Sequence, residues 1–371
     1  MDIEAEAEKT PLEDRLIELI GRKGPITIAD YMADALGHPH DGYYMTQQPI
    51  GETGDFTTAP EVSQIFGELI GLWLVDVWRN IGSPENFNLV ELGPGRGVLM
   101  EDILRATRVR PAFAKAAQVC LVETSGRLRL EQQKRLKGSG VKPIWADDLA
   151  DIPPGPALVV ANEFFDCLPI QQFERVEKGW RERLVGVNAN ASALAFTLSA
   201  APAPENIDLP AETQSKPGDI VEISPAAQTF TSDLAAMIAD QSGAALIIDY
   251  GHAAAGFGET LQAVRKHKFW PPLASPGRAD LTAHVDFAAL TEAAVDAGAA
   301  VYGPTAQGRF LERLGLALRL EMLCKDKSLE AQHDLRAGAE RIAAPDQMGE
   351  LFKALCITGP DQPEPPGFFD I

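Results

Sequence analysis

The stretch Glu91-Leu92-Gly93-Pro94-Gly95-Arg96-Gly97 stands between an apolar run that starts at Asn88 and a helical pattern carried by Met100, Ile103 and Leu104. Glycines let the backbone turn tightly and let a ligand approach the main chain more closely than a Cβ would allow. In open α/β sheets, nucleotides bind beside turns at the carboxyl ends of the strands. The stretch therefore predicts a strand, a ligand-binding turn and a helix, which together form the first part of an α/β sheet.

Four later runs share the character of this first strand. They are apolar throughout, a pattern typical of strands buried on both faces of a parallel sheet. Helical patterns separate most of them, and such alternation indicates a doubly wound α/β domain with a Rossmann-like sheet. The four runs are Val119–Glu123, Val141–Trp145, Ala157–Glu163 and Ala244–Tyr250.

Segments with other patterns flank and interrupt this sheet. Residues 1–85 predict an N-terminal helical segment, in which Thr58-Ala59-Pro60-Glu61 has the pattern of a capping box. Residues 86–371 are expected to form the main domain, with a helical C-terminal part. A β-rich insertion is expected at about residues 168–222, where polar and apolar residues alternate, and Asp219–Ile223 is expected to rejoin the sheet.

Acidic residues dominate the charge of this 371-residue chain. It contains 33 Lys and Arg against 53 Asp and Glu, a formal net charge of −20. Such a chain repels a phosphate backbone and an anionic membrane surface, so nucleic acid and membranes are disfavoured as partners. A basic partner fits the charge better.

The cysteines and the N-terminus bear on the compartment. Four cysteines without a CxxC, and without a histidine at metal-ligand spacing, predict reduced thiols and no metal site. The first residues, Met1-Asp2-Ile3-Glu4-Ala5-Glu6, have neither the apolar core of a signal peptide nor the arginines of a transit peptide. No uncharged apolar run reaches 18 residues, so no membrane insertion is expected. These features predict a cytoplasmic protein.

The glycine-rich turn offers candidates for cofactor binding. Gly93, Gly95 and Gly97 depart from the dinucleotide fingerprint, because Val98 stands where its third small residue would fall. This departure disfavours NAD, although a nicotinamide-dependent oxidoreductase stays open as an alternative. Glu91 suits a cationic ligand, since a carboxylate attracts a sulfonium or an ammonium group.

Further candidates lie at the ends of the next strands. Glu123 ends the second strand, where a carboxylate accepts hydrogen bonds from both hydroxyls of an adenosine ribose. Asp147 and Asp148 follow the third strand, where a carboxylate can accept from the adenine amino group, although adjacent loop acids are also simply solvated. Asn162, near the end of the fourth strand, is the remaining candidate for cofactor binding.

Taken together, these features resemble the class I fold of methyltransferases that use S-adenosyl-L-methionine (SAM). Other stretches resemble the MidA family within that fold, whose members are linked to the assembly of respiratory complex I. They are Tyr43-Tyr44-Met45, Gly54-Asp55-Phe56-Thr57-Thr58-Ala59-Pro60-Glu61, Asn162-Glu163-Phe164-Phe165-Asp166 and Ile248-Asp249-Tyr250-Gly251. The resemblance runs from about residue 11 to the C-terminus, and the acidic start without a transit sequence suggests a bacterial member.

The resemblance implies SAM as the cofactor and dimethylation of an arginine in a protein substrate, a complex I core subunit. An arginine side chain stays protonated and delocalised, so its site must offer carboxylates that bind the planar guanidinium. Glu163 and Asp166 follow the fourth strand and Asp249 ends the fifth, so these three acids are the catalytic candidates. Each could instead be a capping or turn residue. A non-catalytic assembly chaperone for a basic subunit is the other open alternative.

Overall fold

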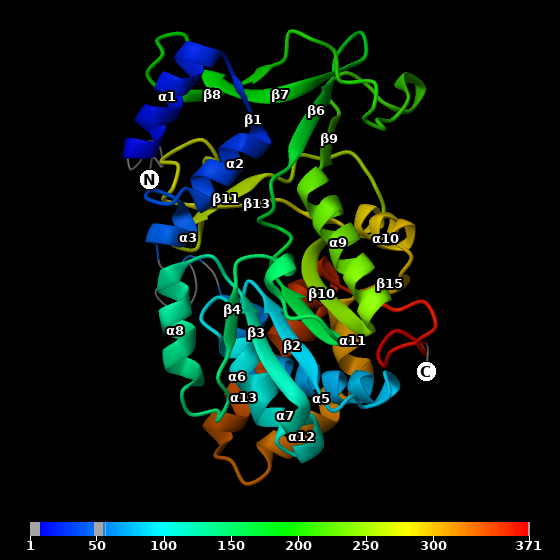
Figure 1. Cartoon of the computed structure of the whole chain (residues 1–371). Coiled ribbons are helices and arrows are strands. Elements are labelled where there is room, and N and C mark those ends of the chain that lie inside the picture. Colours follow the sequence, from blue (N-terminus) through cyan, green and yellow to red (C-terminus); the bar gives the residue numbers. More distant parts are fainter. Residues whose placement is uncertain (1–7, 48–54, 56, 370–371) are drawn as a thin grey trace. The chain divides into compact units, whose positions relative to one another are not determined.

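Two compact units make up the chain in the computed structural model, which describes residues 8–47, 55 and 57–369 (Figure 1). Their division differs from the expected boundary between residues 85 and 86, because residues 57–85 group with the parallel sheet. The first, here called the meander unit, comprises Met1–Phe56, Asp166–Gln228 and Ala254–His284. The second, the sheet unit, comprises Thr57–Phe165, Thr229–Ala253 and Val285–Ile371.

The sheet unit is built on a mostly parallel sheet with the strand order β15-β16-β10-β5-β2-β3-β4. Its parallel strands overlap the five apolar runs of the sequence, although β4 shares only Ile144 and Trp145 with the third run, so the expected Rossmann-like α/β sheet is confirmed. Figure 1 shows β2, β3 and β4 side by side. The parallel strands are β2 (Phe87–Leu92), β3 (Ala117–Val122), β4 (Ile144–Ala146), β5 (Ala157–Asn162) and β10 (Gly243–His252).

Two antiparallel strands from the C-terminal part complete this sheet. β16 (Phe352–Thr358) pairs with β10, and β15 (Ala300–Ala306) pairs with β16, while the short β14 (Val285–Asp286) runs parallel to the end of β10. The sequence predicted a helical C-terminal part; its helices are present, and these two strands were not anticipated. A short apolar run such as that of β16 cannot be distinguished from a buried helical segment by periodicity alone.

The order of the strands creates a switch point between β2 and β5. From β2 the chain moves to β3 and then β4 on one side, and it returns to β5 on the other side of β2. The connections that follow β2 and β5 therefore leave in opposite directions. At such a point, outside the carboxyl ends of the strands, open α/β sheets bind their ligands.

Helices cover this sheet, and one pair packs closely through glycines. On α5, a Cβ added to Gly67 would lie 2.5 Å from the Cβ of Asp102, and one added to Gly71 would lie 3.1 Å from the Cα of Ile103, both on α6. The helices of the sheet unit are α4 (Ala59–Val62), α5 (Gln64–Asn80), α6 (Val98–Thr107), α7 (Pro111–Ala116), α8 (Gly126–Leu136), η2 (Leu149–Asp151), α10 (Phe287–Asp296), α11 (Gln307–Arg313), α12 (Leu316–Cys324), α13 (Leu329–Ala343) and η4 (Pro345–Gly349), and α9 (Pro225–Gln241) begins in the meander unit and continues here.

The capping box expected at Thr58–Glu61 is not formed. The side chain of Thr58 makes no cap hydrogen bond to α4, and the cap of the long helix α5 is Ser63, whose hydroxyl accepts from the Ile65 N–H at 3.3 Å. Glu61 pairs with Arg96 instead, at 3.5 Å. Glu61 therefore forms an ion pair with the glycine-rich turn and does not take part in a capping box with Thr58.

The meander unit combines two small antiparallel sheets with N-terminal helices. Their strand orders are β1-β7-β6-β9, with β8 on β7, and β12-β11-β13. The β-rich insertion is therefore present, but β9 pairs with β6 and does not rejoin the parallel sheet. The elements are α1 (Pro11–Lys23), β1 (Ile26–Thr27), α2 (Ile28–Gly37), α3 (Tyr43–Thr46), β6 (Gln171–Arg175), β7 (Trp180–Val187), β8 (Leu194–Leu198), η3 (Glu212–Gln214), β9 (Ile220–Ile223), β11 (Gln262–Arg265), β12 (Lys268–Trp270) and β13 (Asp280–Thr282).

Replacing Leu246, at the centre of β10, by alanine is expected to lower the free energy of unfolding by about 2–5 kcal/mol. The side chain is fully buried in the sheet unit, so its loss removes apolar burial and leaves a cavity. Urea unfolding followed by circular dichroism measures the change. Leu318→Ala on α12 is the matched control, because Leu318 is 65% exposed and its loss should cost less than about 0.5 kcal/mol. Equal losses for the two variants would contradict the assignment of the core.

Candidate cofactor and acceptor site

The glycine-rich turn adopts a backbone that requires its glycines. Gly93, Gly95 and Gly97 have φ values of 58°, 50° and 78°, in the left-handed region that side chains disfavour. A Cβ on Gly93 would lie only 2.9 Å from Cδ2 of Phe164, which follows β5. The turn that ends β2 therefore packs directly against the segment that ends β5.

Glu91 is buried at the end of β2, and one of its oxygens is left unsatisfied. Burial raises its pKa well above the ordinary value; a backbone hydrogen bond from Met100 opposes this rise, and the nearby Glu123 adds to it. Among the described residues, Oε2 of Glu91 has no hydrogen-bond partner. A buried carboxylate oxygen without a partner is costly, so a cation or donor supplied by a ligand would stabilise it.

Glu123 follows β3 directly, and both of its oxygens are oriented. Oε1 accepts from the Ser125 N–H at 2.8 Å, and Oε2 accepts from Nε2 of Gln132 at 3.2 Å. Burial raises the pKa of Glu123, and these two hydrogen bonds oppose the rise. The carboxylate therefore has the fixed geometry that a pair of ribose hydroxyls needs.

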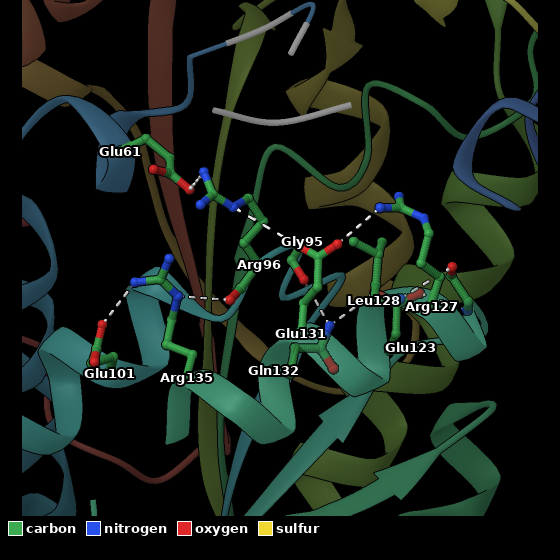
Figure 2. Close-up of polar contacts among 11 residues, drawn as sticks. Glu61, Gly95, Arg96, Glu101, Glu123, Arg127, Leu128, Glu131, Gln132 and Arg135 are labelled. Carbon is green, nitrogen blue, oxygen red and sulfur yellow. Dashed lines mark hydrogen bonds and ion pairs between the residues drawn. The ribbon is translucent and has the colours of Figure 1, made fainter. Parts of the chain in front are cut away.

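Helix α8 holds the glycine-rich turn through side chains on one of its faces, as Figure 2 shows. Nε2 of Gln132 donates to the carbonyl oxygen of Gly95 at 2.8 Å, and Nε of Arg135 donates to that of Arg96 at 2.9 Å. Arg135 also pairs with Glu101 on α6 at 2.9 Å. Two consecutive carbonyl groups of the turn are therefore fixed by one helix.

The side chain of Arg96 extends this network to α4. It lies 3.5 Å from Glu61 and 4.0 Å from Glu131, which in turn pairs with Arg127 at 2.9 Å (Figure 2). The sequence did not single out α8 for a role at the site. The available signal was Gln132, a polar residue in the buried stripe that Leu128 and Leu136 form at helical spacing.

The structure gives Asp147 and Asp148 protein partners of their own. Asp147 pairs with Arg129 at 2.6 Å while its side chain is 74% exposed. Asp148 caps the short helix η2 by accepting from the Leu149 N–H. These contacts explain both acids locally, so a role with adenine has weaker support for them than the ribose role has for Glu123.

At the end of β5, Asn162 and Glu163 form a connected pair. Oε1 of Glu163 accepts from Nδ2 of Asn162 at 3.0 Å and from the Ala59 N–H, at the start of α4, at 3.1 Å. The φ of Glu163 is 51°, a strained value that a non-glycine residue adopts where the surroundings enforce it, often at functional sites. Oδ1 of Asn162 is buried and has no partner within the described part of the chain.

Asp249 on β10 is fully buried and serves as an acceptor for backbone amides. Its Oδ2 accepts from the N–H groups of Phe164 at 3.1 Å and Phe165 at 2.9 Å, and Oδ1 accepts from Tyr250 at 2.9 Å. Direct contact with an acceptor was expected for this residue. The observed contacts also hold the segment that carries Glu163, and the expected contact with an acceptor stays a prediction.

Asp166 belongs to the meander unit, whereas Glu163 and Asp249 belong to the sheet unit. It is buried, and its carbonyl oxygen accepts from the Ala283 N–H at 2.9 Å. Its charge adds to the burial that raises the pKa of Asp280, which accepts from the Tyr44 hydroxyl at 2.9 Å. The three acids are therefore not a single cluster within one unit.

Two further observations concern the Gly54–Glu61 stretch and possible metal ligands. Gly54 and Phe56, from the Gly54–Glu61 stretch, lie outside the described residues, and Asp55 accepts from the Tyr43 hydroxyl at 2.6 Å. Within residues 8–47, 55 and 57–369, no group of three or more His, Cys, Asp or Glu side chains could hold a metal ion.

A parallel sheet with this strand order, a glycine-rich turn after β2, an acid after β3 and an antiparallel pair at one edge defines the class I methyltransferase fold. The family model described as "Putative S-adenosyl-L-methionine-dependent methyltransferase" matches residues 69–305. The chain belongs to this family of SAM-dependent methyltransferases, and the expected MidA membership is confirmed.

Curated relatives and a solved structure agree with this assignment. The human "Protein arginine methyltransferase NDUFAF7, mitochondrial" is 38% identical over 380 residues, covering 95% of this chain and 84% of the relative. The Drosophila melanogaster homologue is 39% identical over 386 residues, covering 95% and 86%. A Burkholderia thailandensis protein bound to S-adenosyl-homocysteine has a TM-score of 0.78 and 26% identity, covering 97% of this chain and 92% of that one.

These findings correct the expected location. The bacterial cytoplasmic assignment is contradicted, since the Xenopus laevis, Drosophila and human relatives are all named as mitochondrial proteins. The acidic N-terminal residues are therefore not a guide to the compartment. Among the described helices, none combines the length and apolar character needed to span a membrane.

SAM is the cofactor, and the residues at the switch point fit it. The turn at Gly93 has no room for a side chain, and Glu91 offers a buried oxygen that has no partner among the residues described. The carboxyl of Glu91 lies beside a turn that would receive a cationic sulfonium, and such a cation would favour the ionised form that burial disfavours. A carboxyl at the position of Glu91 suits SAM better than a dinucleotide, whose pyrophosphate it would repel once ionised.

Replacing Gly93 by valine is expected to abolish SAM binding in isothermal titration calorimetry. The new side chain would occupy the space beside Phe164 and would strain the left-handed backbone. Gly126→Ala is the control, because a Cβ at this first residue of α8 meets nothing within 4 Å. Undiminished binding by the Gly93 variant would remove this turn from the cofactor site.

Proposed function

We propose that this protein transfers methyl groups from SAM to an arginine side chain of a protein substrate, and that the substrate is a core subunit of respiratory complex I during assembly. The observation that carries the arginine proposal is the similarity to curated relatives named protein arginine methyltransferases. They are 36–39% identical to this chain over 90–95% of its length. The complex I subunit rests on the resemblance to the MidA family.

The residues after β5 suit the recognition of a guanidinium. SAM, when bound, supplies an electrophilic methyl group on a sulfonium, so the chain has to position and orient the acceptor. The Ala59 N–H and the Asn162 amide hold the carboxylate of Glu163 in place. A fixed carboxylate can accept from the planar guanidinium and draw its positive charge away from the attacking nitrogen.

Asp249 stabilises the segment that follows β5. Its two oxygens bind the backbone amides of Phe164, Phe165 and Tyr250, which fixes the turn in which Glu163 lies. We therefore assign Glu163 to contact with the acceptor and Asp249 to positioning. The catalytic role expected for Asp166 stays a prediction, because this residue belongs to the meander unit.

Glu163→Gln is expected to lower methyl transfer to a protein substrate at least 100-fold while changing the dissociation constant of SAM by less than about 3-fold. Glutamine keeps an oxygen for the Ala59 N–H but loses the negative charge that binds a guanidinium. Transfer is measured with radiolabelled SAM and complex I core subunits, and binding by calorimetry. Glu292→Gln on α10 is the control, because this glutamate is exposed and lies outside the site.

The outcomes separate the proposals. Unchanged transfer by the Glu163 variant would remove this residue from catalysis. Mass spectrometry of complex I core subunits from cells that lack the protein tests the substrate directly. Loss of a dimethyl-arginine signal supports the enzyme, whereas an intact signal together with failed assembly would favour a non-catalytic chaperone.

Added salt is expected to slow methyl transfer to the protein substrate. The chain carries a net charge of −20, which steers a basic partner toward it at low ionic strength. Raising NaCl from about 25 mM to about 300 mM shortens the Debye length from above to below about 10 Å. This change should lower kcat/KM several-fold. A short neutral peptide with one arginine should respond less. Equal salt sensitivity for both would mean that the charge does not act through partner steering.

A further inference from the structure

Gln132 is a fully buried polar residue in the middle of α8. Its neighbours on the buried face of this helix, one turn away on each side, are Leu128 and Leu136. A leucine at this position would continue the stripe and bury more apolar surface. The polar side chain therefore costs burial energy unless each of its polar atoms has a partner.

The amide of Gln132 satisfies all of its polar atoms, and it joins three segments. Its Nε2 donates to the Gly95 carbonyl at 2.8 Å and to Oε2 of Glu123 at 3.2 Å. Its Oε1 accepts from the indole N–H of Trp145 on β4 at 2.8 Å. An indole N–H can only donate, so the orientation of the amide is determined, and its two N–H bonds must face the two acceptors.

We propose that Gln132 is a positioning residue of the SAM site, which locks the glycine-rich turn and the carboxylate of Glu123 into one geometry before the cofactor binds. Figure 2 shows Gln132 between these two groups. The proposal rests on the proposed role of Glu123 with the ribose. It goes beyond that role because it names a residue that does not touch the cofactor yet sets its affinity.

The physical reason is preorganisation. Gly95 has no Cβ, so its backbone is freer than that of other residues, and the hydrogen bond from Gln132 to its carbonyl restricts this freedom. Glu123 has its other oxygen bound by Ser125, so the contact from Gln132 fixes the second. A site that is ordered before binding loses less entropy when the ligand enters, and this gain appears as affinity.

Gln132→Glu gives a readout that a packing role alone would not give. At pH 8 the introduced carboxylate can accept from Trp145 but cannot donate to Gly95 or Glu123. The dissociation constant of SAM is expected to rise at least 10-fold at this pH. As the pH falls to 5.5, the introduced carboxyl gains a proton and can donate again, so the loss relative to wild type should shrink. The charged groups near this position are Glu123, which accepts from Gln132, and Arg129 on the same helix, so the introduced carboxyl titrates together with Glu123.

Three further variants complete the experiment. Gln132→Met keeps the volume but cannot donate, so its loss of affinity should be about equal at both pH values. Trp145→Phe removes the donor that orients the amide and should weaken SAM binding about 3-fold. Gln133→Glu is the matched control, because this neighbour on α8 makes the same charge change at an exposed position and should leave the dissociation constant within 2-fold.

Calorimetry with SAM and with S-adenosyl-homocysteine measures affinity, and steady-state kinetics should show a raised KM for SAM with kcat within about 2-fold. Circular dichroism confirms that each variant is folded. If Gln132→Met does not fold, the pH dependence of Gln132→Glu and the effect of Trp145→Phe carry the test. Dissociation constants within 2-fold of wild type for the Gln132 variants would overturn the proposal, even where Glu123→Ala weakens binding. An unaffected Glu123→Ala would instead refute the ribose role on which the proposal rests.

Discussion

The backbone of the turn after β2 is the constraint on which the site depends. Three residues with left-handed φ values follow one another at alternate positions, at Gly93, Gly95 and Gly97, and the first of them touches Phe164 from the segment after β5. Only glycine fits such a turn without strain or collision. Because β2 and β5 flank the switch point of the sheet, the same turn joins the expected cofactor-binding end of β2 to the segment after β5.

Buried acids have two different uses in the sheet unit. Asp249 accepts from three backbone amides, so its contacts hold the chain in shape around the end of β5. Glu91 keeps an oxygen without a partner within the described residues, and burial raises its pKa, which is the condition of a group that a ligand completes. The donors available to each carboxylate therefore distinguish Asp249 from Glu91, and residue type does not reveal the difference.

Much of the fold could be predicted from the sequence, because buried parallel strands are apolar throughout and the five runs from Asn88 to Tyr250 have that character. β15 and β16 were missed, since a short apolar run near the C-terminus is also compatible with a helix. The capping box at Thr58 failed for a related reason: Glu61 gains an ion pair with Arg96 that a local pattern cannot anticipate. Gly93, Gly95, Gly97 and Glu123 could be predicted as candidates for cofactor binding, because they directly follow strands of the parallel sheet.

By itself, the sequence determined the α/β class, the cofactor turn and the set of candidate acids, because strand burial and glycine placement leave local signals in the chain. The tertiary structure decided which hydrogen-bond donors orient each acid. It placed Gln132 against Gly95 and Glu123, assigned Asp249 to backbone amides, and put Asp166 in a different unit from Glu163. Those outcomes depend on hydrogen bonds between residues far apart in the chain, and no local periodicity encodes such partners.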